Sequence, residues 1–253
     1  MKKRIDLNCD MGEGFGLYAY GADAEIIPHV SSANIACGFH GGDPSVMRRT
    51  VQLARDHGVA LGAHVGFPDL RGFGRRGLHV SPSDLKNDVT YQIGALAAFV
   101  RAAGAALHHV KPHGALYMLA LDDRDLSRAI AEATFEHDKN LMIYTIHDSA
   151  TDREATRLGL RVIPEFFADR GYHSHGKVKM FDWKLAEAGR TPRAIGNRVV
   201  RLLRKGRVTS IEGGDISVKT ETICVHSDTP GAPHLAKAIR QALGRAGFAI
   251  QAP

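Results

Sequence analysis

Short runs of apolar and β-branched residues alternate along the chain with longer stretches in which apolar residues recur every three to four positions. The first pattern predicts β-strands, and the second predicts amphipathic helices. Strands are predicted over residues 4–10, 32–39, 59–65, 107–113, 141–147, 161–168 and 221–227. Helices are predicted over residues 44–58, 81–104, about 123–137, 150–158, 192–205 and 231–247.

The repeated order of strand and helix predicts a parallel sheet, because parallel neighbours need a crossover connection. About seven such units in 253 residues favour a closed or nearly closed β/α barrel over a doubly wound sheet. No Pro/Ser-rich linker and no repeat of fixed period divides the chain, so residues 1–253 are expected to form a single domain.

Composition excludes several classes of protein. The net charge of +6 is scattered, and its one dense run, residues 201–207, reads as the solvated end of a helix rather than a nucleic-acid patch. No apolar run is long enough to cross a bilayer, and the N-terminus lacks the apolar region of a signal peptide. Three widely spaced cysteines suggest reduced thiols, so we expect a cytoplasmic protein that binds neither membrane nor nucleic acid.

Carboxylates and imidazoles follow nearly every predicted strand. Since active sites of parallel β/α proteins lie at the carboxyl ends of the strands, these side chains are expected to converge on one rim. The candidates in chain order are Asp6, Asn8, Asp10, Glu13, His40, Asp43, His64, Lys111, His113, Glu165, Asp169 and Arg170.

The segment HHVKPHGALY, residues 108–117, holds the densest titratable chemistry. Strand alternation places His109, Lys111 and His113 on the inner face and His108 outside. A lysine inside a barrel is costly unless it is paired or used. Two interpretations remain open: an ion pair with Asp6 or Asp10, or a cation or proton donor for a substrate carboxylate or carbonyl.

Two further patterns bear on cofactors. Asp10, His40 and His64 could together hold a divalent metal, since carboxylate and imidazole ligands suit Zn, Mn or Fe. The run GFGRRG, residues 72–77, has dinucleotide-binding spacing but does not join a strand directly to a helix, so a flexible loop at the site is favoured. No P-loop motif for ATP is present.

A series of motifs resembles one family. IDLNCDMGEGFG, SSANIACGFHGGD, GAHVGFPDLRGFGRR, YQIGALAAF, HVKPHGALY and EFFADRGY occur in that order, and TICVHSD extends the likeness towards the C-terminus. Together they look like the LamB/YcsF family. The resemblance implies a seven-stranded, TIM-like β/α barrel related to polysaccharide deacetylases, and the role of the A subunit in an ATP-dependent 5-oxoprolinase. That enzyme opens the lactam ring of 5-oxo-L-proline to L-glutamate, with partner subunits B and C.

On this reading Asp10, Glu13, Lys111 and His113 are expected to be catalytic, with ATP bound in the complex and activating the amide. Asp10 or Glu13 would act as base on water or orient the intermediate. Lys111 and the imidazoles of His40 and His113 would stabilise the developing negative charge. Substrate binding is expected from Asp6, Asn8, Asp43, Glu165, Asp169 and Arg170.

The loop at 173–189 departs from the family pattern, and we expect it to touch substrate or partner. Two alternatives stay open: a metal-dependent, ATP-independent amidohydrolase or deacetylase, and a non-catalytic lactam-binding subunit. The sequence is also compatible with a homo-oligomer.

Overall fold

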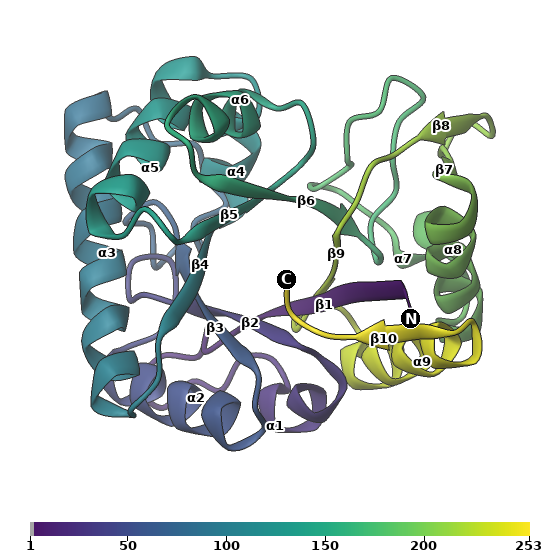
Figure 1. The fold of residues 1–253 in the computed structure, drawn as a ribbon, viewed down its shortest axis with the longest axis horizontal. Helices are drawn as coiled ribbons and strands as arrows, with labels where there is room; N and C mark the ends of the chain where they lie inside the picture. Colours follow the sequence, from purple (N-terminus) through teal and green to yellow (C-terminus); the bar gives the residue numbers. More distant parts are fainter. Residues whose placement is uncertain (1–2) are drawn as a thin grey trace.

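Seven parallel strands close into a barrel in the computed structural model, which describes residues 3–253 (Figure 1). Each strand pairs with the next, and the last pairs with both β6 and β1, so the sheet has no open edge. The predicted barrel is confirmed. Both ends of every predicted strand fall within three residues of the ends of an observed strand. The barrel strands are β1 (Lys3–Met11), β2 (Ser32–Ala36), β3 (Ala60–Val65), β4 (Leu107–Pro112), β5 (Met142–Thr145), β6 (Arg161–Phe167) and β9 (Thr222–His226).

Strand β1 changes neighbour along its length. Its first residues, Lys3 to Ile5, pair with β10 (Phe248–Ile250), and Asp6 to Asp10 pair with β9. The sequence did not predict β10, because three residues are too few to show a period. The same holds for the antiparallel hairpin of β7 (Arg207–Thr209) and β8 (Asp215–Ser217).

Helices surround the barrel and follow the sequence signals for their ends. Ser81 caps α3 by accepting a hydrogen bond from the Asp84 N–H, and Pro82 occupies the first turn, as expected. Shorter helices near 23–29, 114–120 and 185–188 were not resolved by periodicity. The helices are α1 (Asp23–Ile26), the 3-10 turn η1 (Ile27–His29), α2 (Pro44–Asp56), α3 (Pro82–Ala102), α4 (Gly114–Ala120), α5 (Arg124–His137), α6 (Ala150–Arg157), α7 (Leu185–Ala188), α8 (Pro192–Lys205) and α9 (Ala232–Arg245).

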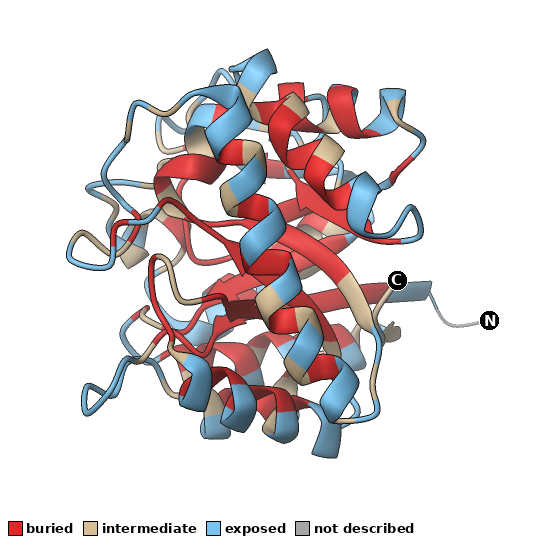
Figure 2. Ribbon diagram, turned by 90° about the vertical axis from the view of Figure 1, so that its left-hand side faces the viewer, coloured by how far each residue is buried: buried red, intermediate tan, exposed pale blue. Residues whose placement is uncertain are grey.

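The apolar core lies between the barrel and its helices, and Figure 2 shows the strands buried beneath the helical layer. Along β1, Leu7 and Cys9 belong to this core. The alternate residues Asp6, Asn8 and Asp10 are also buried, but they hydrogen-bond across the barrel interior. A polar interior leads from the floor of the barrel to its mouth, and the site is built there. No helix among residues 3–253 has the length and apolar character needed to cross a membrane.

Candidate functional site

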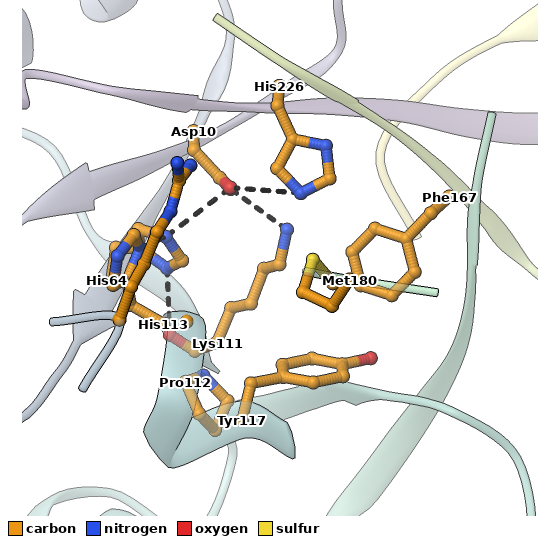
Figure 3. Close-up of a pocket in the computed structure, with 11 residues that line it drawn as sticks. Asp10, His64, Lys111, Pro112, His113, Tyr117, Phe167, Met180 and His226 are labelled. Carbon is orange, nitrogen blue, oxygen red and sulfur yellow. Dashed lines mark hydrogen bonds and ion pairs between the residues drawn. The ribbon is translucent and has the colours of Figure 1, made fainter. Parts of the chain in front are cut away.

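Lys111 lies at the centre of the barrel mouth, with its side chain almost fully buried (Figure 3). Its Nζ is 2.8 Å from Asp10 Oδ1, 3.1 Å from Glu165 Oε1 and 3.1 Å from Cys224 Sγ. Burial opposes the charged ammonium, but Asp10, Cys224 and Glu165 outweigh it and raise the Lys111 pKa well above its usual range. The predicted ion pair therefore exists, with Asp10 as the partner and Asp6 lying deeper.

A second cluster gathers beside this pair from four chain segments. Glu13 Oε1 lies 3.3 Å from His40 Nε2, 3.3 Å from His113 Nδ1 and 3.8 Å from His64 Nε2. One ligand atom from each of the four residues lies within 4.8 Å of the others. Within the described residues, Glu13 Oε1 and both ring nitrogens of His40 are buried and form no hydrogen bond. Buried polar atoms normally have partners, so these atoms fit the ligand set of a cation.

The tautomers support the same interpretation. His64 Nδ1 is 3.0 Å from the Lys111 carbonyl, and His113 Nε2 is 2.8 Å from the Phe73 carbonyl. Each ring must donate a proton to its carbonyl, which leaves the facing nitrogens of the neutral rings unprotonated. These nitrogens, His64 Nε2 and His113 Nδ1, lie 2.9 Å apart, so two lone pairs face each other. A cation between them would remove the repulsion, and a carbonyl that orients a histidine in this way is common around metals.

Electrostatics favour the neutral, metal-binding form of two imidazoles in this cluster. Burial and the neighbouring imidazoles lower the pKa of His40 and of His113 well below the usual range. Burial and the charge of Asp10 raise the pKa of Glu13 well above its usual range. The structure thus groups His40 and His64 with Glu13 and His113. Asp10, predicted as their companion, lies 3.4 Å from His64 Nε2 but is engaged by Lys111.

A carboxylate–imidazole pair forms the opposite wall. Asp169 Oδ1 lies 3.0 Å from His226 Nδ1, and its other oxygen accepts hydrogen bonds from the His226 backbone and the Thr229 hydroxyl. His226 Nε2 then points towards Asp10, 3.8 Å away (Figure 3). The ring stacks on Phe167. This arrangement fixes the tautomer and aims one nitrogen of a proton-transfer group into the cavity.

Asp6 and Asn8 form the floor beneath the cavity. Thr222 Oγ1 donates to Asp6 Oδ2 at 2.5 Å and accepts from Asn8 Nδ2 at 2.7 Å. Above them, Asn34 bridges Asn8 and His109, and the inward direction expected for His109 is confirmed. These residues build a rigid base for Asp10 and Lys111.

Other predicted residues stabilise the structure around the site. Asp43 caps α2 by accepting from the Val46 N–H, and its other oxygen accepts from the Gly16 N–H. Arg170 pairs with Asp169 at 3.0 Å and stacks under Trp183. None of the six residues expected to bind substrate lines the central cavity, namely Asp6, Asn8, Asp43, Glu165, Asp169 and Arg170.

The cavity itself is small. Its volume is about 20 Å³, enough for about one water molecule. Arg75 from the loop after β3 and Met180 from the 173–189 loop both line it, so a larger ligand requires these segments to shift. Met180 thus brings the divergent loop to the cavity, while its expected contact with substrate or partner stays a prediction.

Three residues of the site were not singled out in the sequence: Phe167 and Met180, which line the cavity, and Cys224, which contacts Lys111. Period-2 alternation in β9 could have identified Cys224, since it follows Thr222 on the inner face of the strand. Nothing in the local sequence of Met180 signals its position, because the long loop that carries it has no period.

The model of the LamB/YcsF family matches residues 5–253. The A subunit of 5-oxoprolinase from Heliobacterium modesticaldum is 51% identical over 250 residues, which cover 98% of both chains. The protein of the same name from Thermus thermophilus is 47% identical, over 98% of this chain and 99% of its own.

Solved structures agree with these relatives. The crystal structure of a lactam utilization protein from Thermus thermophilus has a TM-score of 0.91 at 46% identity, and the match covers 99% of this chain and 100% of that one. A family 4 carbohydrate esterase from Streptomyces lividans has a TM-score of 0.51 at 12% identity, over 98% of this chain and 91% of its own, which shows a shared fold alone. The barrel, the order of its motifs and these full-length matches together place the chain in the LamB/YcsF family.

Proposed function

We propose that this chain is the A subunit of an ATP-dependent 5-oxoprolinase, a cytoplasmic enzyme that opens the lactam ring of 5-oxo-L-proline to give L-glutamate. Relatives with that name align with the chain over its full length at about half identity. The name denotes one subunit of an assembly, and we propose subunits B and C as the partners. The observation that carries the proposal is the convergence of Asp10, Lys111, His64, His113 and His226 on one buried cavity.

Ring opening of a lactam has three chemical requirements: a polarised carbonyl, an activated water and a proton for the departing nitrogen. Asp10 is suited to orient and deprotonate water. Burial favours its protonated form, but charged neighbours, Lys111 among them, hold its pKa well below the usual range and keep it ionised. In this proposal Lys111 acts mainly by fixing that carboxylate, because its N–H groups already face three partners.

His226 is the side chain best arranged to deliver the proton. The carboxylate of Asp169 holds its Nδ1–H, so Nε2 can take up the proton that Asp10, 3.8 Å away, removes from water and pass it to the lactam nitrogen. Tyr117 lines the same cavity, and its Oη forms no hydrogen bond within the described part of the chain.

Glu13, His40, His64 and His113 would hold a divalent metal. Such an ion, when bound, would polarise the substrate carbonyl and lower the pKa of a water. In this role Glu13 and His113 would serve as ligands beside Asp10.

The test is reconstitution. The chain should be mixed with subunits B and C, and glutamate release from 5-oxo-L-proline should be measured with and without ATP. Release that needs all three subunits and ATP is expected. Failure of this chain, while the A subunit of another 5-oxoprolinase restores activity to the same partners, would reject the proposal.

The metal-like cluster and the deacetylase-type fold support one second candidate, a metal-dependent amidohydrolase that needs neither ATP nor partners. It predicts that the isolated chain hydrolyses lactams or acetamides and that chelation abolishes this activity. His40→Ala should remove the bound metal in elemental analysis. This candidate would be excluded if the isolated chain is inactive and the activity of the reconstituted complex is insensitive to chelators.

A further inference from the structure

Arg75 is fixed at the cavity by its neighbours in the chain. The Gly74 carbonyl accepts the Ala115 N–H at 2.9 Å, and the Phe73 carbonyl lies 2.8 Å from His113 Nε2. The backbone before Arg75 is thus docked on the start of α4, beside the histidine cluster. Its side chain lines the cavity and is 37% exposed, which places the guanidinium at the entrance.

Arg75 has hydrogen-bonding capacity to spare. Lys111 is the other lysine or arginine among the described residues that line the cavity, and its ammonium already faces Asp10, Glu165 and Cys224. Arg75 has one carboxylate partner, Asp228, reached through a single terminal nitrogen. A guanidinium has five N–H donors in a planar fork, so most of its donors remain available to a second anion.

Asp228 can release Arg75 without being left unpaired. The hydroxyl of Tyr20 lies 3.3 Å from Asp228 Oδ2, and the Arg170 guanidinium lies 3.8 Å from Oδ1. The Arg75–Asp228 pair is therefore a contact that an incoming anion can share or replace.

The charge of the cavity makes such a cation necessary for an anionic substrate. The inner wall presents the ionised Asp10 carboxylate, and Lys111 is occupied in neutralising it. A substrate carboxylate would be repelled unless a separate cation received it on the entrance side. We propose that Arg75 binds the carboxylate of the substrate and makes this site selective for lactams that carry one. The inference rests on the proposed function and deepens it by assigning the residue that recognises the acid group.

The test compares two nearly isosteric substrates in the reconstituted complex, 5-oxo-L-proline and its carboxamide, 5-oxo-L-prolinamide. The wild-type chain should prefer the acid. Arg75→Gln should raise KM for the acid about 10- to 100-fold while leaving the amide within about twofold, because a charge-assisted, forked contact is lost for the acid alone. Arg75→Lys should recover part of the preference. Arg71→Gln is the matched control, since Arg71 is exposed in the same loop but does not line the cavity.

An unchanged preference in Arg75→Gln would overturn the assignment. Equal losses for acid and amide would overturn it as well, because Arg75 would then act on the loop or on another anionic group of the reaction. Equilibrium binding of 5-oxo-L-proline, measured by calorimetry without ATP, separates this inference from the proposed function. Weaker binding to Arg75→Gln than to wild type supports the carboxylate site even if the complex shows no turnover.

Discussion

Lys111 stabilises the fold as well as the site. Its ammonium lies between the buried carboxylates of Asp10 and Glu165, and both have side chains that are at most 5% exposed. Removing one partner of a buried pair leaves an uncompensated charge, which costs far more than the pair itself contributes. A change at Lys111 should therefore disturb the fold as well as the reaction.

We expect Lys111→Ala to lose activity and also about 3–5 kcal/mol of unfolding free energy. Urea unfolding measures the loss, with Lys86→Ala as the control, because Lys86 pairs with glutamates near the surface. The double variant Lys111→Ala/Glu165→Gln should regain part of the stability, since one orphaned charge is removed. Strict additivity of the two substitutions would contradict this account.

Asp23 gives the protein a dependence of stability on pH. Its Oδ2 accepts the Gly12 N–H at 2.7 Å, next to Glu13, while Oδ1 has no partner among the described residues. Burial raises the pKa of Asp23 to about 6, although the Gly12 hydrogen bond opposes this. The folded state then binds the proton more tightly than the unfolded chain does, so this contribution to stability is present below about pH 4 and is lost as the pH rises through about 6.

Asp23→Asn should remove that dependence. The unfolding free energy of the variant minus that of wild type should rise by about 1–2 kcal/mol as the pH goes from about 4.5 to about 7.5. Urea unfolding at both pH values provides the measurement. A difference between the two chains that stays constant across this range would show that Asp23 does not titrate as described.

At the scale of elements, strand alternation decides which side chains enter the barrel. In β4, His109 and Lys111 point inward, whereas His108, near the start of the strand, is half-buried and has its Nε2 3.3 Å from the Pro253 carbonyl. His109 stacks on Tyr144 and needs space on its other side. Gly62 in β3 provides that space, because a Cβ there would lie 2.1 Å from His109 Nε2.

Gly62→Ala should therefore destabilise the barrel by about 1–3 kcal/mol through overpacking. Gly94→Ala is a suitable control, since a Cβ at that position of α3 meets open space and alanine favours the helix. Chemical denaturation of the two variants should give shifts of opposite sign. Wild-type stability in Gly62→Ala would mean that β3 and β4 adjust freely.

At the scale of the whole molecule, the sequence predicted the barrel and the rim on which its chemistry gathers. Both follow from local periods and from the rule that parallel strands end together. Which atoms meet depends on the stagger of the strands and on loops, and these leave no local signal. Glu13 therefore joins His40 and His113 unexpectedly. Asp43, which looked the same in sequence, serves a helix end, because it precedes Pro44 at the first turn.

The pairing of β1 with β9 and β10 has a consequence for biosynthesis. The strand that carries Asp6, Asn8 and Asp10 is made early, while the strands that flank it on one side come from residues 222–250. During translation, that edge of β1 stays unpaired until residues 222–250 have been synthesised. Exposed strand edges promote association between chains. A chain stopped before residue 222 would lack His226 and would also keep its barrel open, so premature termination should yield aggregation rather than a partly active enzyme.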